Sequence, residues 1–200
     1  MIKERPILFS APMVRAILDG RKSQTRRIAK PIKHPDWGNE YSPGALITEK
    51  ESNDVIDRAC PYGAKGDRLW VRETFQPLFA DGIENYSEVN WKTGKGYQIS
   101  YPATDGVQEF MDSDDNISDA CKPSIHMPRW ASRILLEITN VRVERLQDIS
   151  EEDAIAEGVS LSNLPAVPIT KFKELWESIN GPGSWDLNPW VWVVEFKRIG

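Results

Sequence analysis

The stretch LDGRKSQTRR, residues 18–27, decides how the rest of this chain is interpreted. Upstream of it, residues 7–9 are apolar and predict a short buried strand. The apolar spacing of residues 14–18 then predicts a helix that Ser10 can cap and that Gly20 ends, because glycine tolerates the left-handed conformation at a helix end. The basic stretch therefore leaves a helix end as a turn or a short extended segment.

Charge is distributed unevenly along the chain. The net charge is −5, yet residues 1–33 hold nine basic and two acidic side chains, a local +7, so the other 167 residues carry −12. The overall acidity argues against bulk non-specific binding to nucleic acid, whereas the asymmetry is compatible with a local surface that attracts anions. The alternative is a solvated basic face that acidic neighbours neutralise.

Length and composition set further bounds. The chain has 200 residues, of which 40% are hydrophobic, which suits one domain with insertions and excludes a wholly disordered chain. No apolar run approaches the ~20 residues of a membrane-spanning helix, and the charged start does not resemble a secretory signal. The 2 cysteines cannot form a disulfide framework. We therefore expect a cytoplasmic protein without a membrane association.

Periodicity predicts strands joined by polar connections. Residues 67–75 and 133–145 alternate as strands do, the second with a change of phase near Asn140, and residues 190–197 are apolar on both faces, which predicts a central strand. Short helices are expected to begin at Ser150 and Thr170, the second with Phe172, Leu175, Trp176 and Ile179 on one face. Residues 34–66 are expected to be irregular. Residues 76–120 are expected to form an acidic insertion with one or two strands and a mobile segment near 104–120. Such strands usually close as a small barrel.

The stretch GRKSQTRR, residues 20–27, is similar to the G-x-K-x-x-x-x-R element of the ASCH domain family. The similarity continues at residues 66–71, 146–158 and 191–196. The resemblance implies an α+β fold: a PUA-like small β-barrel with short helices at its rim. It further implies a single domain over residues 1–200 with long irregular insertions at about 34–60 and 76–122. The chain also resembles prophage-borne ASCH-like proteins.

Three residues match the catalytic residues of one branch of that family, the small bacterial N4-acetylcytidine amidohydrolases. By this resemblance Thr25 attacks the acetyl carbonyl, and Lys22 activates the Thr25 hydroxyl or holds the oxyanion. Glu157 then shuttles a proton to the departing amine. From spacing alone, a lysine with a hydroxyl three residues later is a weak signal, because basic turns that contain Ser or Thr are common. Glu157 can equally be an acid on an exposed helix that faces water.

A second set of residues is predicted to line a cleft and bind the substrate or nucleic acid. Trp70 and Arg72 share a strand face and can stack on a base or contact phosphate, although Trp70 can instead pack under the insertion. Residues 124–133 form a basic and aromatic segment that can supply another wall, or surface charges at a strand end. The predicted binding residues are Arg21, Arg26, Trp70, Arg72, Glu73, His126, Arg129 and Arg133.

Several functions stay open at this point. The first is an amidohydrolase that acts on an N4-acylated cytidine. The second is a non-catalytic module that binds RNA or a modified nucleoside, and the third is an ASCH-type ribonuclease in which His126 supplies one half of an acid–base pair. The acidic insertion can also dock a protein partner. The spacing of Cys60, Cys121, His34 and His126 lacks the close ligand pairs of structural zinc, so we expect neither a metal nor a cofactor.

Overall fold

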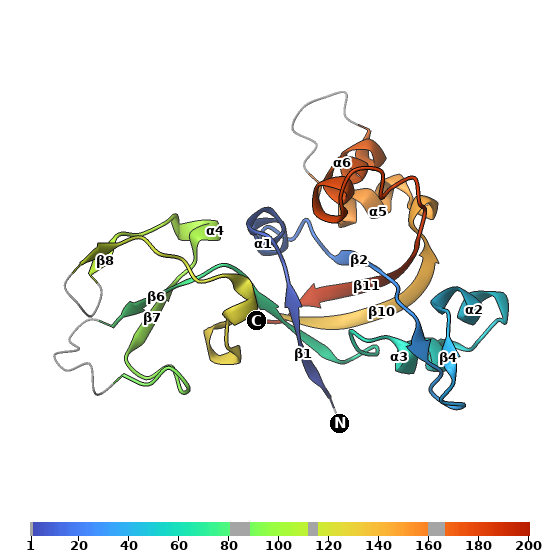
Figure 1. Cartoon of the computed structure of the whole chain (residues 1–200), viewed down its shortest axis with the longest axis horizontal. Coiled ribbons are helices and arrows are strands. Elements are labelled where there is room, and N and C mark those ends of the chain that lie inside the picture. The colour runs from blue at the N-terminus through green and yellow to red at the C-terminus, as the bar shows by residue number, and fades with distance from the viewer. Residues whose placement is uncertain (1, 81–88, 112–115, 160–166) are drawn as a thin grey trace. The chain divides into compact units, whose positions relative to one another are not determined.

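The computed structural model describes residues 2–80, 89–111, 116–159 and 167–200 (Figure 1). The chain forms two compact units. The first unit contains Met1–Arg5, Ala16–Leu69 and Leu136–Ile199, and the second contains Pro6–Arg15, Trp70–Leu135 and Gly200. The second unit thus includes most of the insertion expected at 76–122. A single domain over residues 1–200 stays a prediction.

One five-stranded sheet runs in the order β1-β5-β10-β11-β2. These strands are β1 (Glu4–Leu8), β5 (Arg68–Arg72), β10 (Leu135–Arg145), β11 (Trp190–Arg198) and β2 (Gln24–Ile28). The prediction of a central C-terminal strand is confirmed, because β11 lies between β10 and β2. The change of phase expected near Asn140 is also confirmed, since the β10–β11 register shifts between Ile138 and Asn140. The α+β class is confirmed, whereas closure into a barrel is not: β1 and β2 are the outer strands of this sheet in the described residues.

Two helices cover one face of β11 in the first unit (Figure 1). They are α5 (Glu151–Ala156) and α6 (Pro168–Asn180), joined to the strands through the short 3₁₀ turn η4 (Leu146–Asp148). The cluster that they bury consists of Leu146, Ile149, Ala154, Phe172, Trp176, Trp185, Val191 and Val193. Helix α6 begins two residues before the expected Thr170, because a proline is accommodated in a first turn. Of the four residues expected on one face, Phe172 and Trp176 are buried, whereas Ile179 is 54% exposed.

Residues 34–66, expected to be irregular, contain regular elements. They are β4 (Glu40–Tyr41), which pairs with β3 (Ile32–Lys33), then α2 (Pro43–Thr48) and α3 (Asn53–Ala59). The prolines and glycines that suggested a loop mark helix ends instead: Pro43 occupies the first turn of α2. Ser52 caps α3 by accepting a hydrogen bond from the Val55 backbone N–H.

The second unit holds two short hairpins and its own core. Strand β6 (Gln76–Phe79) pairs with β7 (Tyr97–Ser100), and β8 (Phe110–Met111) pairs with β9 (Ile117–Ser118). Helix α4 (Pro102–Asp105) and the 3₁₀ turns η2 (Ser124–His126) and η3 (Arg129–Ala131) complete the unit. Its core is Phe75, Met127 and Ala131, with Trp91, Ile99, Tyr101 and Trp130 packed against it. The insertion therefore contains more strands than expected, while residues 112–115 of the expected mobile segment lie outside the described residues.

The described helices are all too short or too polar to cross a membrane. The longest of them, α6, has 13 residues.

Gly44 provides a test of packing in the first unit. A Cβ atom at this position would lie 2.3 Å from Nε1 of Trp190. The Arg145 guanidinium lies 4.3 Å from the centroid of the same indole ring, so the ring has little room to move.

We expect Gly44→Ala to lower the free energy of unfolding by about 1–3 kcal/mol in denaturant melts, through overpacking. Thr48→Ala, on an exposed position of the same helix, is the matched control and should change it by less than about 0.5 kcal/mol. Equal effects of the two substitutions would contradict the packing of Gly44 against Trp190.

Candidate functional site

A buried ion pair joins Lys22 to Glu157 in the first unit. The Lys22 ammonium donates to Oε2 of Glu157 at 2.9 Å and to the Glu157 carbonyl oxygen at 2.8 Å. The Lys22 side chain is 0% exposed and that of Glu157 is 3% exposed. Of the three residues predicted to be catalytic, these two are therefore brought together, and the alternative of a solvent-facing Glu157 is wrong.

The backbone fixes both ends of this pair. Lys22 follows α1 (Ala11–Leu18), and the N–H groups of Arg21 and Lys22 both donate to the carbonyl of Ala16, at 2.8 and 2.9 Å. Lys22 and Glu157 also form an isolated β-bridge. Gly158 adopts φ +85°, and a Cβ on it would lie 2.9 Å from the Cβ of Lys22. Glycine is required at position 158 because it tolerates the positive φ and because a side chain there would collide with Lys22.

Helix α5 carries the acidic partner because its sequence defines both of its ends. The Ser150 hydroxyl accepts a hydrogen bond from the Asp153 N–H at 3.1 Å, as the expected capping pattern requires. At the other end Glu157 is the C-cap residue. Asp153 and Glu157 stand four residues apart and so share one side of the helix.

Arg26 on β2 connects this pair to a wider ionic network. Its Nη1 donates to Oε1 of Glu157 at 3.1 Å, and its Nη2 donates to Oδ2 of Asp153 at 2.8 Å. Its Nε donates to Oε1 of Glu144 at 3.1 Å. The Arg26 side chain is 0% exposed. Each guanidinium nitrogen thus has a carboxylate partner, which leaves no exposed donor for a phosphate in this arrangement.

Arg142 extends the network across the sheet. Its Nη2 lies 3.0 Å from Oδ2 of Asp153, its Nε lies 2.9 Å from Oε2 of Glu144, and its Nη1 pairs with Glu195. Sequence reasoning missed Arg142, Glu144, Asp153 and Glu195 as members of the site. The available signal was the pair of opposite charges, Arg142 and Glu144, two residues apart on β10. Such a pair is equally typical of the solvent-facing side of a strand.

Burial and charge shift the pKa values of this network in defined directions. Burial lowers the pKa of Lys22, and the attraction of Glu157 only partly offsets this effect. For Asp153 burial favours a higher pKa, but the hydrogen bond and charge of Arg26, together with the charge of Arg142, reverse this and lower its pKa. The network therefore favours an ionised Asp153 and a Lys22 that loses its proton more readily than usual.

Thr25, the third predicted catalytic residue, is placed by the β2–β11 register. It is paired with Val194, whereas Arg26 is paired with Val193, which belongs to the cluster under α5 and α6. Neighbouring strand residues point to opposite faces, so the Thr25 side chain lies on the other face from Arg26. Thr25 is buried. Within the described ranges its hydroxyl makes no hydrogen bond to Lys22 or Glu157, and its role as a nucleophile stays a prediction.

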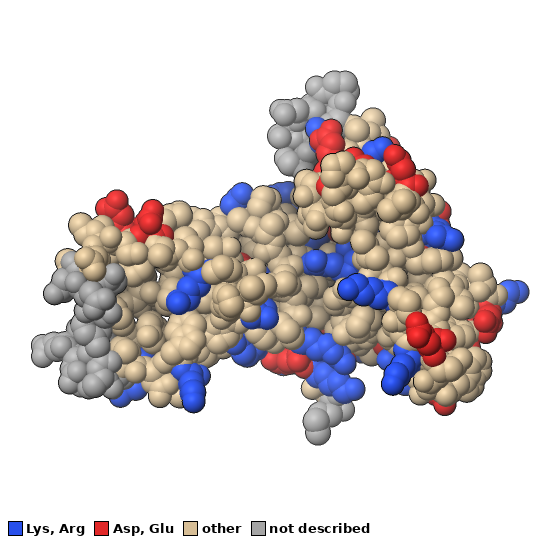
Figure 2. Space-filling view, viewed as in Figure 1, with Lys and Arg blue, Asp and Glu red and all other residues tan. Residues whose placement is uncertain are grey.

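Arg21 is the predicted binding residue that lies at the surface of the first unit. Its side chain is 46% exposed and pairs with Asp19 at 2.9 Å. Figure 2 shows acidic side chains gathered over α5 and α6, where Glu151 and Glu152 are exposed. The prediction that Arg21 contacts a substrate is untested.

The remaining predicted binding residues lie in the second unit, where two of them bind each other. Arg133 donates to both carboxylate oxygens of Glu73 at 3.0 Å, and its guanidinium lies 3.9 Å from the ring centroid of Tyr101. Glu73 is almost fully buried, at 1% exposure. This bidentate pair stabilises the unit from within.

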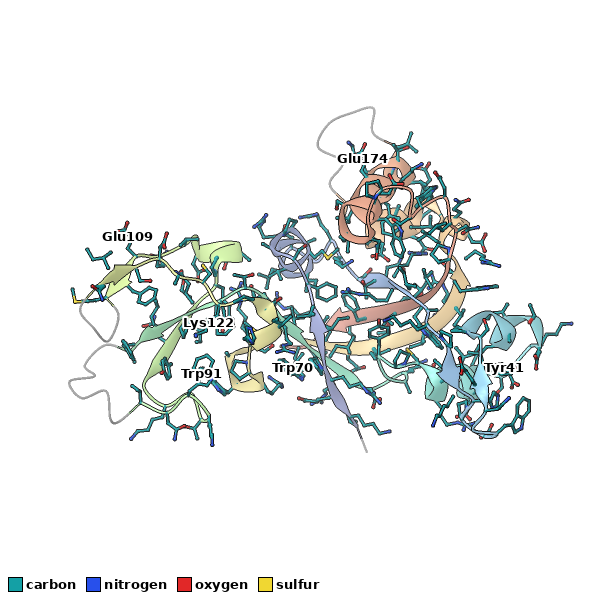
Figure 3. The ribbon with its side chains drawn as sticks, viewed as in Figure 1. Tyr41, Trp70, Trp91, Glu109, Lys122 and Glu174 are labelled. Atoms are coloured by element: carbon teal, nitrogen blue, oxygen red, sulfur yellow. The ribbon has the colours of Figure 1, made fainter. Side chains whose placement is uncertain are left out.

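Trp70 and Arg72 also contact each other in the second unit. The Arg72 guanidinium lies 5.5 Å from the Trp70 ring, labelled in Figure 3, and donates to the carbonyl of Ile125. Trp70 is half-buried, while His126 and Arg129 are exposed. The predicted cleft combines residues of both units and stays a prediction.

The comparisons with known proteins return a weak similarity to one solved structure. No protein-family model and no curated protein matches the chain. An ASCH domain from Lactobacillus crispatus JV V101, known from a high-resolution crystal structure, is similar to it at 13% identity with a TM-score of 0.42. The alignment covers 98% of this chain and 79% of that one. At this level of similarity the fold class of the chain rests on its own helices and strands.

Replacing Arg26 tests whether the network is as interdependent as its contacts indicate. Arg26→Met keeps the length of the side chain but leaves three carboxylates without this partner, so we expect the free energy of unfolding at neutral pH to fall by about 3–5 kcal/mol. Arg21→Met is the matched control, and removing its exposed pair should cost less than about 1 kcal/mol. Denaturant unfolding of both variants is the measurement. An Arg26→Met protein as stable as the control would show that the network contributes no net stability.

Proposed function

We propose that this chain is an ASCH-like hydrolase that cleaves the acyl amide of an N4-acetylcytidine-like nucleoside at the Lys22–Glu157 pair. The observation that carries the proposal is the burial of that pair, with a lysine whose pKa is lowered. Removing two charges from water costs several kcal/mol per ion, and an apolar pair of similar volume would stabilise a core at least as well. Buried groups with shifted pKa values are concentrated at functional sites. The sequence similarity of residues 20–27 to the ASCH element supports the same site.

The reaction requires a nucleophile and the delivery of a proton to the departing amine. In the proposed route the Thr25 hydroxyl attacks the acyl carbonyl, and its proton goes to the neutral amine of Lys22. Lys22 passes that proton to Glu157, which delivers it to the departing cytosine amine as the C–N bond breaks. Water then hydrolyses the threonine ester, which releases the carboxylic acid and restores the Thr25 hydroxyl. Since Thr25 lies on the other face from Arg26, a water activated by Lys22 is the competing nucleophile. Neither Lys22 nor Glu157 is exposed, so turnover requires a movement that uncovers them.

Binding of RNA without chemistry has weaker support. That function relies on exposed cations, whereas the donors of Arg26 are all engaged by carboxylates and Arg133 is engaged by Glu73. A ribonuclease requires a pair of acid–base groups, and the sequence offers His126 as only one half of such a pair. Docking of a protein partner and a cytoplasmic location remain expectations from composition.

The turnover experiment uses N4-acetylcytidine, free and within RNA, with acetate release followed by mass spectrometry. We expect Lys22→Met and Glu157→Gln to lower kcat/KM by at least about 10²-fold, since each removes a proton-transfer group. Lys30→Met, which changes an exposed lysine nearby, is the control and should retain wild-type rates. Thr25→Val distinguishes the two nucleophiles, because it abolishes turnover only if the hydroxyl attacks. Well-folded wild-type protein that releases no acetate would overturn the proposal.

The pH dependence of kcat/KM separates the two roles offered for Lys22. A general base must be neutral, so the rate rises with pH as Lys22 loses its proton. A cation that holds the oxyanion must be charged, so the rate falls. Because burial lowers the pKa of Lys22, we expect a rising limb whose midpoint lies below the ordinary value of 10.5. Initial rates between pH 6 and pH 10 measure it. A rate that falls across the titration of Lys22 would assign it the role of cation instead.

A further inference from the structure

A cavity of about 560 Å³ lies within the second unit, between its two hairpins and the segment that leads into η2. Its volume falls in the range of ~300–1,000 Å³ that is typical of small-molecule sites. None of the residues proposed to be catalytic belongs to it. The lining consists of Pro77, Phe79, Tyr97, Phe110, Ser118, Ala120, Cys121, Lys122, Pro123 and His126.

Aromatic rings form the apolar part of this cavity. Phe79 on β6 and Tyr97 on β7 face each other across the hairpin, with ring centroids 5.7 Å apart and planes inclined by 26°. Phe110 on β8 contributes a third ring. All three residues are half-buried, so parts of the rings stay accessible from the cavity. Accessible aromatic rings in a concave site are suited to stacking on a planar ring of a ligand.

The charge of the lining is positive in a segment that is otherwise acidic. Residues 76–120 contain nine acidic side chains, and among the described residues that line the cavity none carries a carboxylate. Lys122 supplies an exposed ammonium, whose Nζ lies 5.7 Å from the ring centroid of Trp91 (Figure 3). Two backbone hydrogen bonds with Phe75, at 2.8 and 3.2 Å, fix the base of this lysine. An exposed ammonium in the lining of an aromatic cavity can pair with an anionic group of a ligand.

We propose that this cavity binds a planar aromatic ring that carries one anionic group, a ligand of the size of a nucleoside monophosphate. The ring stacks on Phe79 and Tyr97, and the anionic group pairs with Lys122. This site is separate from the Lys22–Glu157 pair, and the proposal does not depend on hydrolysis at that pair.

Titration of the full-length protein with cytidine 5′-monophosphate tests this site. Calorimetry gives the affinity, and amide chemical shifts in NMR spectra locate the contact. Binding should shift signals of residues 77–79, 97 and 118–126. Cytidine and inorganic phosphate, which each carry only half of the proposed chemistry, should bind at least about tenfold more weakly.

Three variants identify the groups responsible. Lys122→Glu should weaken binding of the nucleotide by at least about tenfold, because it places a carboxylate beside the anion. Lys95→Glu makes the same charge change at an exposed residue of the unit that does not line the cavity, and should alter the affinity by less than about twofold. Ala120→Trp fills the cavity and should abolish binding. Thermal melts monitored by circular dichroism confirm that each variant is folded.

Two outcomes would overturn the proposal. One is the absence of shifts at the lining residues with 10 mM nucleotide. The other is equal weakening by Lys122→Glu and Lys95→Glu, which would indicate attraction to the general charge of the unit. A cytidine trinucleotide distinguishes the sources of the ligand: tighter binding than the monophosphate assigns the cavity to an RNA strand, and weaker binding assigns it to a free nucleotide.

Discussion

The ion pair between Lys22 and Glu157 is the constraint on which the site of the first unit depends. Two charges buried together are stable only when their remaining hydrogen-bonding capacity is also satisfied. The carbonyl of Glu157 accepts from Lys22, and Arg26 donates to the second carboxylate oxygen, so the requirement is met by the chain itself. Arg26 is itself a buried charge, so its remaining N–H donors need Asp153 and Glu144 as acceptors. The network extends because each buried charge requires a partner.

This requirement explains why α5 lies where it does. A helix of six residues is too short to be stable alone, so its position must be set by tertiary contacts. On its apolar side Ala154 belongs to the cluster with α6, and on its polar side Asp153 and the adjoining Glu157 bind Arg26. Gly158 then allows the chain to pass close to Lys22. Packing and charge thus orient the same short helix from two directions.

Local periodicity accounts for the parts of the fold that the sequence predicted well. The strands at 67–75 and 133–145 alternate clearly, and the change of phase near Asn140 marks a real shift of register. The short helices within 34–66 were missed because seven residues of this segment are Pro or Gly, which also mark loops. The family resemblance named Lys22 and Glu157 as members of one site, and the fold places them in contact, while their catalytic role stays a prediction. Arg26 could not be recognised as buried, because its partners stand 118 to 131 residues away in the sequence. No local pattern distinguishes such an arginine from one that faces solvent.

Four of the nine basic side chains in residues 1–33 pair with carboxylates once the chain is folded. Arg5 pairs with Asp67 and Arg21 with Asp19, while Lys22 and Arg26 are engaged by Glu157 and its neighbours. For these four side chains the interpretation that acidic neighbours neutralise the basic segment applies. A site built this way gains little from the phosphates of a nucleic acid, because attraction to phosphate requires cations that are free to release counterions. Under the proposed function, recognition at the Lys22–Glu157 pair would rest on the shape and hydrogen bonding of the nucleoside and its acyl group, which favours an uncharged nucleoside as the substrate to test.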